Sequence, residues 1–154
     1  MRKMISFAVF ALLATSLSAQ TVANMKDLNA EKKSAAINLK LTGTLTTTRN
    51  SDFRQLRDLC WQLRTLDLSE ATCPVLPKNA FHSRHHLQSI ILPNQLQEIG
   101  SQAFFACDNL QEVVIPKSVT KVGTAAFSGC KALKNITIDG TPELGEFAFA
   151  NLEG

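Results

Sequence analysis

Two neighbouring stretches of the sequence repeat one another at a fixed distance. The first, LQSIILPNQLQEIGSQAFFAC, covers residues 87–107, and the second, LQEVVIPKSVTKVGTAAFSGC, covers residues 110–130. Their leading leucines, Leu87 and Leu110, lie 23 residues apart, and Leu133 follows at the same step. Self-similarity at a fixed period is the sequence signature of a repeat architecture, so this repeat decides the fold.

The repeat extends to four copies, two of them strict and two less regular. The copy that starts at Leu63 carries one additional residue, and the copy that starts at Leu133 lacks one. Each copy nevertheless keeps an Ala-Phe pair at the corresponding place, with the phenylalanines at Phe81, Phe104, Phe127 and Phe149. We expect these rings to form an aromatic column inside the protein.

Each copy begins with a short apolar stretch of β-strand character. In the stretch LQEVVI, alternation along a strand directs Leu110, Val113 and Ile115 to the core. Glu112 and Val114 then point the other way. One such unit cannot cover its own apolar face, so neighbouring copies must stack and join their strands into a parallel ladder.

The predicted fold is therefore an α/β repeat, a right-handed leucine-rich-repeat solenoid with a parallel strand ladder. Gly100, Gly123 and Gly145 recur where each copy must turn sharply. Glycine adopts positive φ without a steric penalty, and we expect these three residues to serve the turn in this way.

The repeats resemble the BspA-like leucine-rich repeat family. The resemblance rests on LPNQLQEIGSQAFFACDNLQEVVI (92–115), IPKSVTKVGTAAFSGCKALKNITI (115–138) and LRTLDLSEATCPVLPKNAF (63–81). It covers residues 63–154, which we divide into four repeats of about 23 residues.

The resemblance implies an exported or surface-displayed protein of Bacteroides-like bacteria that binds ligands without catalysis. The implied partner is a protein ligand on host matrix or on another cell, and no cofactor or metal is implied. Members of the family are commonly far longer than this chain. Two interpretations of the exposed core at the last repeat stay open: the sequence is the N-terminal part of a longer protein, or the chain stacks end to end.

The N-terminal segment MRKMISFAVFALLATSLSAQ has the pattern of a secretory signal peptide, with a basic start, an apolar run and small residues. We assign residues 1–19 to the signal peptide and residues 20–35 to a polar, flexible leader. The apolar run is short for a membrane span, which needs about 20 apolar residues. No second apolar stretch follows, so we expect no membrane insertion once the signal is cleaved.

Residues 36–62 are predicted to form an N-terminal cap. Ile37, Leu39 and Leu41 alternate with polar residues as in a half-buried strand. The stretch SDFRQLRDLCWQL then has helical spacing, with its apolar positions at Phe53, Leu56, Leu59, Cys60 and Leu63. We expect Asp52 to cap this helix, and Phe53 and Leu56 to cover the first strand.

The charge balance gives no electrostatic argument for a membrane-surface partner. Arg2 and Lys3 account for two of the 16 basic residues, so 14 basic residues face 13 acidic residues in the rest of the chain. This near-neutral balance gives no argument for nucleic-acid binding.

The cysteines and histidines have ordinary structural interpretations. Cys60, Cys107 and Cys130 each precede a repeat leucine by three residues and form one column, with Arg84 in the missing place. We favour plain packing of these thiols, with a Cys107–Cys130 disulfide as the alternative, and Cys73 is predicted to be the most reactive thiol. The cluster His82, His85 and His86 is assigned to a solvated turn rather than to a metal site.

The outward face of the ladder is the candidate binding surface. Strand alternation places on it Thr65, Asp67, Ser89, Ile91, Glu112, Val114, Asn135 and Thr137. The first hypothesis is an adhesin-like binding protein. The alternative hypothesis is a structural, self-assembling envelope module that associates end to end.

Overall fold

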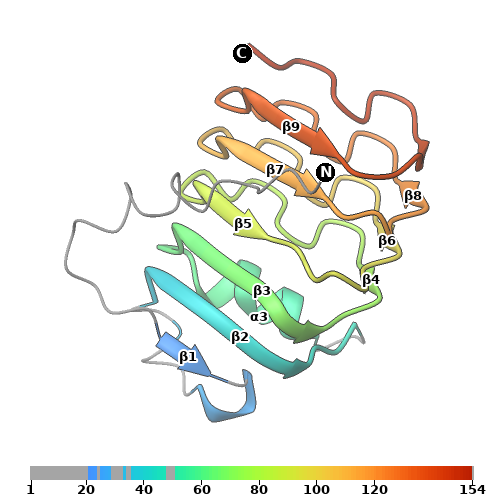
Figure 1. Ribbon diagram of the computed structural model, residues 1–154. Coiled ribbons are helices and arrows are strands. Elements are labelled where there is room, and N and C mark those ends of the chain that lie inside the picture. Colours follow the sequence, from blue (N-terminus) through green and yellow to red (C-terminus); the bar gives the residue numbers. More distant parts are fainter. Residues whose placement is uncertain (1–20, 24, 29–32, 34–35, 48–50, 154) are drawn as a thin grey trace, which may run out of the picture.

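The computed structural model describes residues 21–23, 25–28, 33, 36–47 and 51–153. The predicted signal peptide lies outside these residues. Within them, the chain winds through successive coils that stack into a solenoid, with the N-terminal cap at one end and β9 in the last coil (Figure 1).

Two parallel ladders run along the stack. The six-stranded sheet has the order β1-β2-β3-β5-β7-β9, and the four-stranded sheet has the order β10-β8-β6-β4. The strands of the first sheet are β1 (Thr21–Ala23), β2 (Asn38–Thr44), β3 (Thr65–Thr72), β5 (Ser89–Ile91), β7 (Glu112–Ile115) and β9 (Asn135–Ile138). The strands of the second sheet are β4 (Val75–Leu76), β6 (Glu98–Ile99), β8 (Lys121–Val122) and β10 (Glu143–Leu144). The predicted parallel strand ladder of a solenoid is confirmed.

The register of the ladder follows the sequence period. Glu112 pairs with Asn135, at the 23-residue step. Thr65 pairs with Ser89 at a step of 24, whereas the β4–β6 pairing returns to 23. The additional residue of the first repeat therefore lies between β3 and β4, and the missing residue of the last repeat lies between β9 and β10. Both irregularities are absorbed in these segments, so the packing behind them keeps its period.

The predicted aromatic column is confirmed. The ring centroids of Phe81 and Phe104 are 5.3 Å apart, those of Phe104 and Phe127 are 4.9 Å apart, and those of Phe127 and Phe149 are 5.3 Å apart. The planes of the stacked rings differ by 19°, 7° and 4° along the column. Phe53 of the cap meets Phe81 edge to face, with centroids 5.9 Å apart. The cap thus closes the column with a different geometry from that inside it.

The glycine column is present, but the predicted reason for it is wrong. Neither Gly100, Gly123 nor Gly145 has a positive φ. A Cβ atom at Gly123 would lie 2.4 Å from the backbone nitrogen of Ser101 in the preceding coil. The N–H of Gly123 donates to the carbonyl of Ile99 at 2.7 Å. Glycine is needed here because two coils approach too closely for any side chain.

Positive φ occurs instead at two other columns of the turn. The residues are Asn79, Gln102, Ala125 and Phe147 in one column and Ser83, Ala106, Gly129 and Asn151 in the other. Their N–H groups point along the stack: Gln102 donates to Thr124 and Ala106 donates to Ser128, each at 2.9 Å. A residue other than glycine loses about 1 kcal/mol of stability in the left-handed conformation. The inter-coil hydrogen bonds hold these residues in that conformation.

The predicted strand–helix cap is present, with differences in detail. Helix α3 (Asp52–Leu59) is capped by Ser51, whose hydroxyl accepts from the N–H of Arg54 at 3.2 Å. The predicted cap, Asp52, instead accepts from the N–H of Thr46 at 2.8 Å. Leu59, which we placed on the apolar stripe of this helix, is 41% exposed.

The segment before the cap also differs from the prediction. Residues 20–35 were expected to form a flexible leader, but β1 pairs in parallel with β2, and a 3-10 helix follows at Met25–Asp27. Met25 and Leu28 are buried. Both residues belong to the hydrophobic core cluster that continues into the cap.

Candidate binding face of the strand ladder

The predicted face residues form two rows across the ladder. Strand pairing joins Thr65 to Ser89, Ser89 to Glu112, and Glu112 to Asn135 in one row. The second row contains Asp67, Ile91, Val114 and Thr137, each two residues further along its strand. The structure thus brings all eight predicted residues together on one face.

The face is not uniformly open to solvent. Val114 is 38% exposed, and Ile91 beside it is half-buried. Asn135 and Thr137 on β9 are exposed, whereas Ser89 is buried despite its outward direction. The exposed residues of the two rows are therefore Val114, Asn135 and Thr137, and the half-buried Ile91 lies next to Val114.

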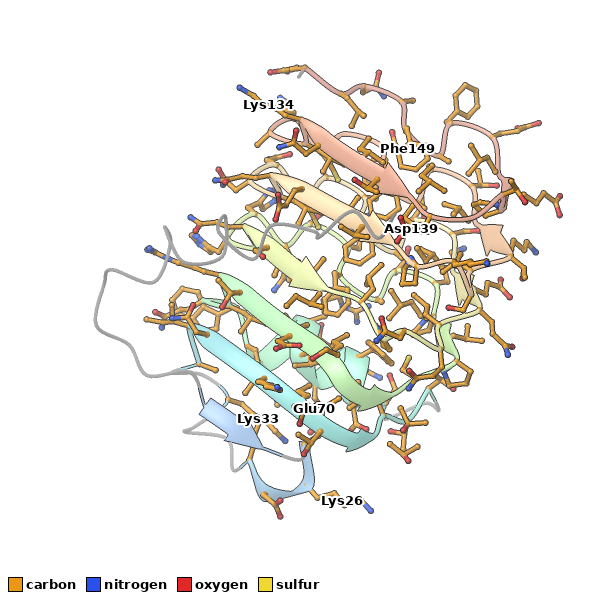
Figure 2. The ribbon with its side chains drawn as sticks, in the orientation of Figure 1. Lys26, Lys33, Glu70, Lys134, Asp139 and Phe149 are labelled. Carbon is orange, nitrogen blue, oxygen red and sulfur yellow. The ribbon has the colours of Figure 1, made fainter. Side chains whose placement is uncertain are left out.

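The cap strand adds residues to this face that sequence reasoning missed. Lys40 on β2 pairs with Asp67 in register, and its ammonium lies 2.6 Å from the Glu70 carboxylate and 3.8 Å from that of Asp67. The hydrogen bond to Glu70 raises the pKa of Lys40. In Figure 2, Glu70 lies on β3 at this end of the ladder. The alternation in residues 37–41 was the signal that could have extended the face to β2.

Asn38 continues the other row. The hydroxyl of Thr65 donates to the side-chain oxygen of Asn38 at 2.8 Å, and a carboxylate oxygen of Asp67 accepts from the N–H of Ser69 at 2.8 Å. The polar groups nearest the cap thus bond with one another, and the exposed residues of the two rows lie on β7 and β9.

The three histidines face different partners. The Nδ1 atom of His85 lies 2.8 Å from the Asp108 carboxylate, and His86 meets the ring of Trp61. His82 stacks on Phe105, with centroids 5.1 Å apart. In the described part of the chain, no group of three or more His, Cys, Asp or Glu side chains is arranged to hold a metal ion.

All four thiols are free and buried. Cys107 donates to the carbonyl of Phe81 at 3.1 Å, and Cys130 donates to that of Phe104 at 3.0 Å. The favoured prediction of plain packing is confirmed, and the alternative disulfide is not formed. The prediction that Cys73 is the most reactive thiol is wrong, since its side chain is fully buried and burial raises its pKa to about 11.

Arg84 replaces cysteine in this column for a structural reason. Its guanidinium donates to the carbonyl of Arg57 at 2.5 Å, in the last turn of α3. The carbonyls at a helix end lack partners within the helix, and a cation there also complements the helix dipole. The longer arginine side chain therefore connects the cap to the first coil, because a cysteine thiol would be too short to reach the Arg57 carbonyl.

Across the residues whose structure is described, no helix combines the length and apolar character needed to cross a bilayer.

The comparisons with known proteins agree with this geometry. The family model described as "BspA type Leucine rich repeat region (6 copies)" matches residues 74–153, just over half of the chain. Two solved structures share the fold: a leucine-rich repeat protein from Bacteroides ovatus, with a TM-score of 0.53, and one from T. pallidum, with a TM-score of 0.50. Each is 21% identical over 75% of this chain, and the match covers 32% and 63% of those two chains respectively.

None of the curated proteins compared with this chain matches it. Leucine-rich repeats generally mediate protein–protein interaction without catalysis, and proteins with BspA-type repeats are generally extracellular or surface-associated. On the evidence of its repeats and its fold, the chain belongs to the BspA-type leucine-rich repeat family.

Proposed function

We propose that this chain is an exported, non-catalytic module that binds a protein ligand of host matrix or of another cell surface. The observation that carries the proposal is the aliphatic pair on the ladder face. Val114 is 38% exposed beside the half-buried Ile91, and polar residues of the same two rows surround them. An apolar centre with a polar rim is the usual composition of a protein-binding patch.

The face supports weak binding by each module rather than a tight single contact. Binding hot spots are enriched in Trp, Tyr and Arg, and the two rows contain none of these. Repeated presentation of the same face raises affinity through avidity. The proposal therefore expects binding that depends on the density of the displayed protein.

The test compares the wild-type chain with Val114→Asp on a panel of immobilised host extracellular-matrix proteins. Leu144→Asp is the matched control, because Leu144 is a similarly exposed aliphatic side chain on β10 of the other sheet. We expect saturable binding that Val114→Asp weakens at least fivefold and Leu144→Asp leaves unchanged. Equal binding by the wild type and Val114→Asp would refute the role of the ladder face.

Export has a separate test. The intact mass of the protein, measured in each cell fraction, is expected to lack residues 1–18 or 1–19 and to be found outside the cytoplasm. A protein that keeps its first residues and stays in the cytoplasm would remove the premise of an extracellular ligand.

A second candidate function is self-assembly through the last coil. Ile138, Leu144 and Phe147 are exposed there, Phe147 to 70%. Figure 2 shows Lys134 and Asp139 at opposite ends of β9, so an antiparallel pairing of two β9 strands would set each lysine against the partner's aspartate. Dimers of this kind would appear as a mass that doubles with concentration in light scattering. Leu144→Asp should suppress the doubling, and Val114→Asp should not.

A further inference from the structure

The edge of the ladder at which its strands begin carries polar and aromatic side chains in register. The backbone N–H of Gln88 donates to the carbonyl of Arg64 at 2.8 Å, that of Gln111 to Gln88 at 3.1 Å, and that of Lys134 to Gln111 at 3.0 Å. These four positions therefore lie side by side in successive coils. Neighbouring coils are about 4.8 Å apart along such a ladder, so the edge repeats similar long polar side chains at this interval.

The only tryptophan of the chain lies at the same edge. Trp61 follows α3 and is 54% exposed. Its ring meets that of His86 edge to face, with centroids 6.5 Å apart. An indole ring that keeps this exposure in the folded protein offers an apolar surface together with an N–H donor.

The turns beside Trp61 hold fixed polar groups. The imidazole of His85 lies 2.8 Å from the Asp108 carboxylate of the next coil, and the amide of Asn109 donates to the His85 carbonyl at 2.5 Å. These contacts tie adjacent turns together. The imidazole, the carboxylate and the amide belong to the turns that lead into Gln88 and Gln111.

We propose that this edge binds an extended, neutral oligosaccharide of β-1,4-linked hexoses, independently of the ladder face. A sugar ring whose hydroxyls are all equatorial presents apolar C–H faces, and one such face would stack on the indole of Trp61. Its hydroxyls both donate and accept, which matches the amides of Gln88 and Gln111. Successive sugars of such a chain advance by about one coil spacing and are rotated by about half a turn, so every second unit presents the same edge to the row.

The composition of the edge favours a sugar over a protein partner. A protein hot spot lies in a well-packed, fully desolvated pocket, whereas Trp61 is 54% exposed near Arg64, at the cap end of the row. The charged members, Arg64 and Lys134, stand at the two ends of the row rather than as a cluster. The middle of the row is neutral, which suits a ligand without carboxylates or phosphates.

The test uses cellohexaose as the probe and the intrinsic emission of Trp61 as the readout. We expect a saturable change in emission with cellohexaose and none with glucose at the same hexose concentration, because several coils must be spanned. By calorimetry, Trp61→Ala should abolish binding, and Gln111→Leu should weaken it about fivefold by removing one hydrogen-bonding partner. Val114→Asp on the ladder face should bind cellohexaose like the wild type.

The proposal is overturned if cellohexaose gives neither a saturable emission change nor a heat signal, or if binding survives Trp61→Ala. It is also overturned if a matrix protein from the panel above, and not the sugar, changes the emission of Trp61, because the edge would then be a protein interface. Folding of each variant is checked by far-UV circular dichroism before binding is measured.

Discussion

Replacement of Gly123 by alanine tests how closely the coils approach. The new Cβ atom would lie 2.4 Å from the nitrogen of Ser101, 2.7 Å from the carbonyl carbon of Gly100 and 2.8 Å from the Cα of Ser101. All three are backbone atoms, which have no rotamer that would relieve the clash. Two coils would have to move apart, against the 2.7 Å hydrogen bond from Gly123 to Ile99.

The sign of the effect separates two explanations of this glycine. At a position with negative φ and free space, a Gly→Ala change stabilises a protein by about 0.4–1 kcal/mol, because it restricts the unfolded chain. Overpacking of a well-packed core costs typically 1–3 kcal/mol. Because the clash at Gly123 is with backbone on several atoms, we expect Gly123→Ala to lower the free energy of unfolding by about 3 kcal/mol, the upper end of that range.

The assay is urea unfolding followed by far-UV circular dichroism, which reports on the strands. With a urea m-value of about 2 kcal/mol/M, the midpoint should fall by about 1.5 M. Gly129→Ala is the matched control: its φ is +75°, but a Cβ atom there would meet its nearest neighbour only at 3.7 Å. Since Ala106 already occupies that column, the control should cost about 1 kcal/mol or less. A Gly123→Ala variant as stable as the wild type, or more stable, would refute the close-approach explanation.

Three further predictions follow from the packing. Phe104→Ala should cost about 4 kcal/mol in urea unfolding, because its ring is buried and stacked on both sides, and a clearly smaller loss would show that the column contributes little. Burial raises the pKa values of Cys60 and Cys73 to about 11. The free energy of unfolding that comes from their neutral thiols should therefore be complete below pH 9 and decline as the pH rises towards 11. A free energy of unfolding that is constant over this range would contradict the raised pKa values. Arg84→Met should remove the hydrogen bond to the Arg57 carbonyl, lower the free energy of unfolding by about 2 kcal/mol and speed hydrogen exchange in α3. Exchange as slow as in the wild type would show that other contacts hold the cap.

The repeat period of the sequence predicted the features of the fold that recur in every coil. Ladder, alternation and aromatic column all follow from side chains that recur at one step, and such a pattern has only one way to cover its apolar residues. The face residues were predicted for the same reason, since a strand that directs Val113 inward must direct Val114 outward.

The remaining features depend on backbone geometry that side-chain types do not record. The left-handed turn positions hold residues as different as Asn79, Gln102 and Ala125, so no composition marks them. The glycine column was visible, but the sequence does not distinguish a need for positive φ from a lack of space. Trp61 carried no periodic signal, and its place at the ladder edge emerges only when the turns of neighbouring coils are set beside it.

The additional residue of the first repeat and the missing residue of the last repeat both lie between the strands of the two sheets. This placement has a consequence for the evolution of such a protein. Each coil presents to the next the same backbone donors and acceptors, and the same aromatic ring, whichever coil it is. A duplication or deletion of one full period therefore recreates an acceptable junction wherever its breakpoints fall. Recombination in register between the corresponding stretches at 87–107 and 110–130 would lengthen or shorten the stack while leaving the cap, the ladder edge and every surviving coil as they were.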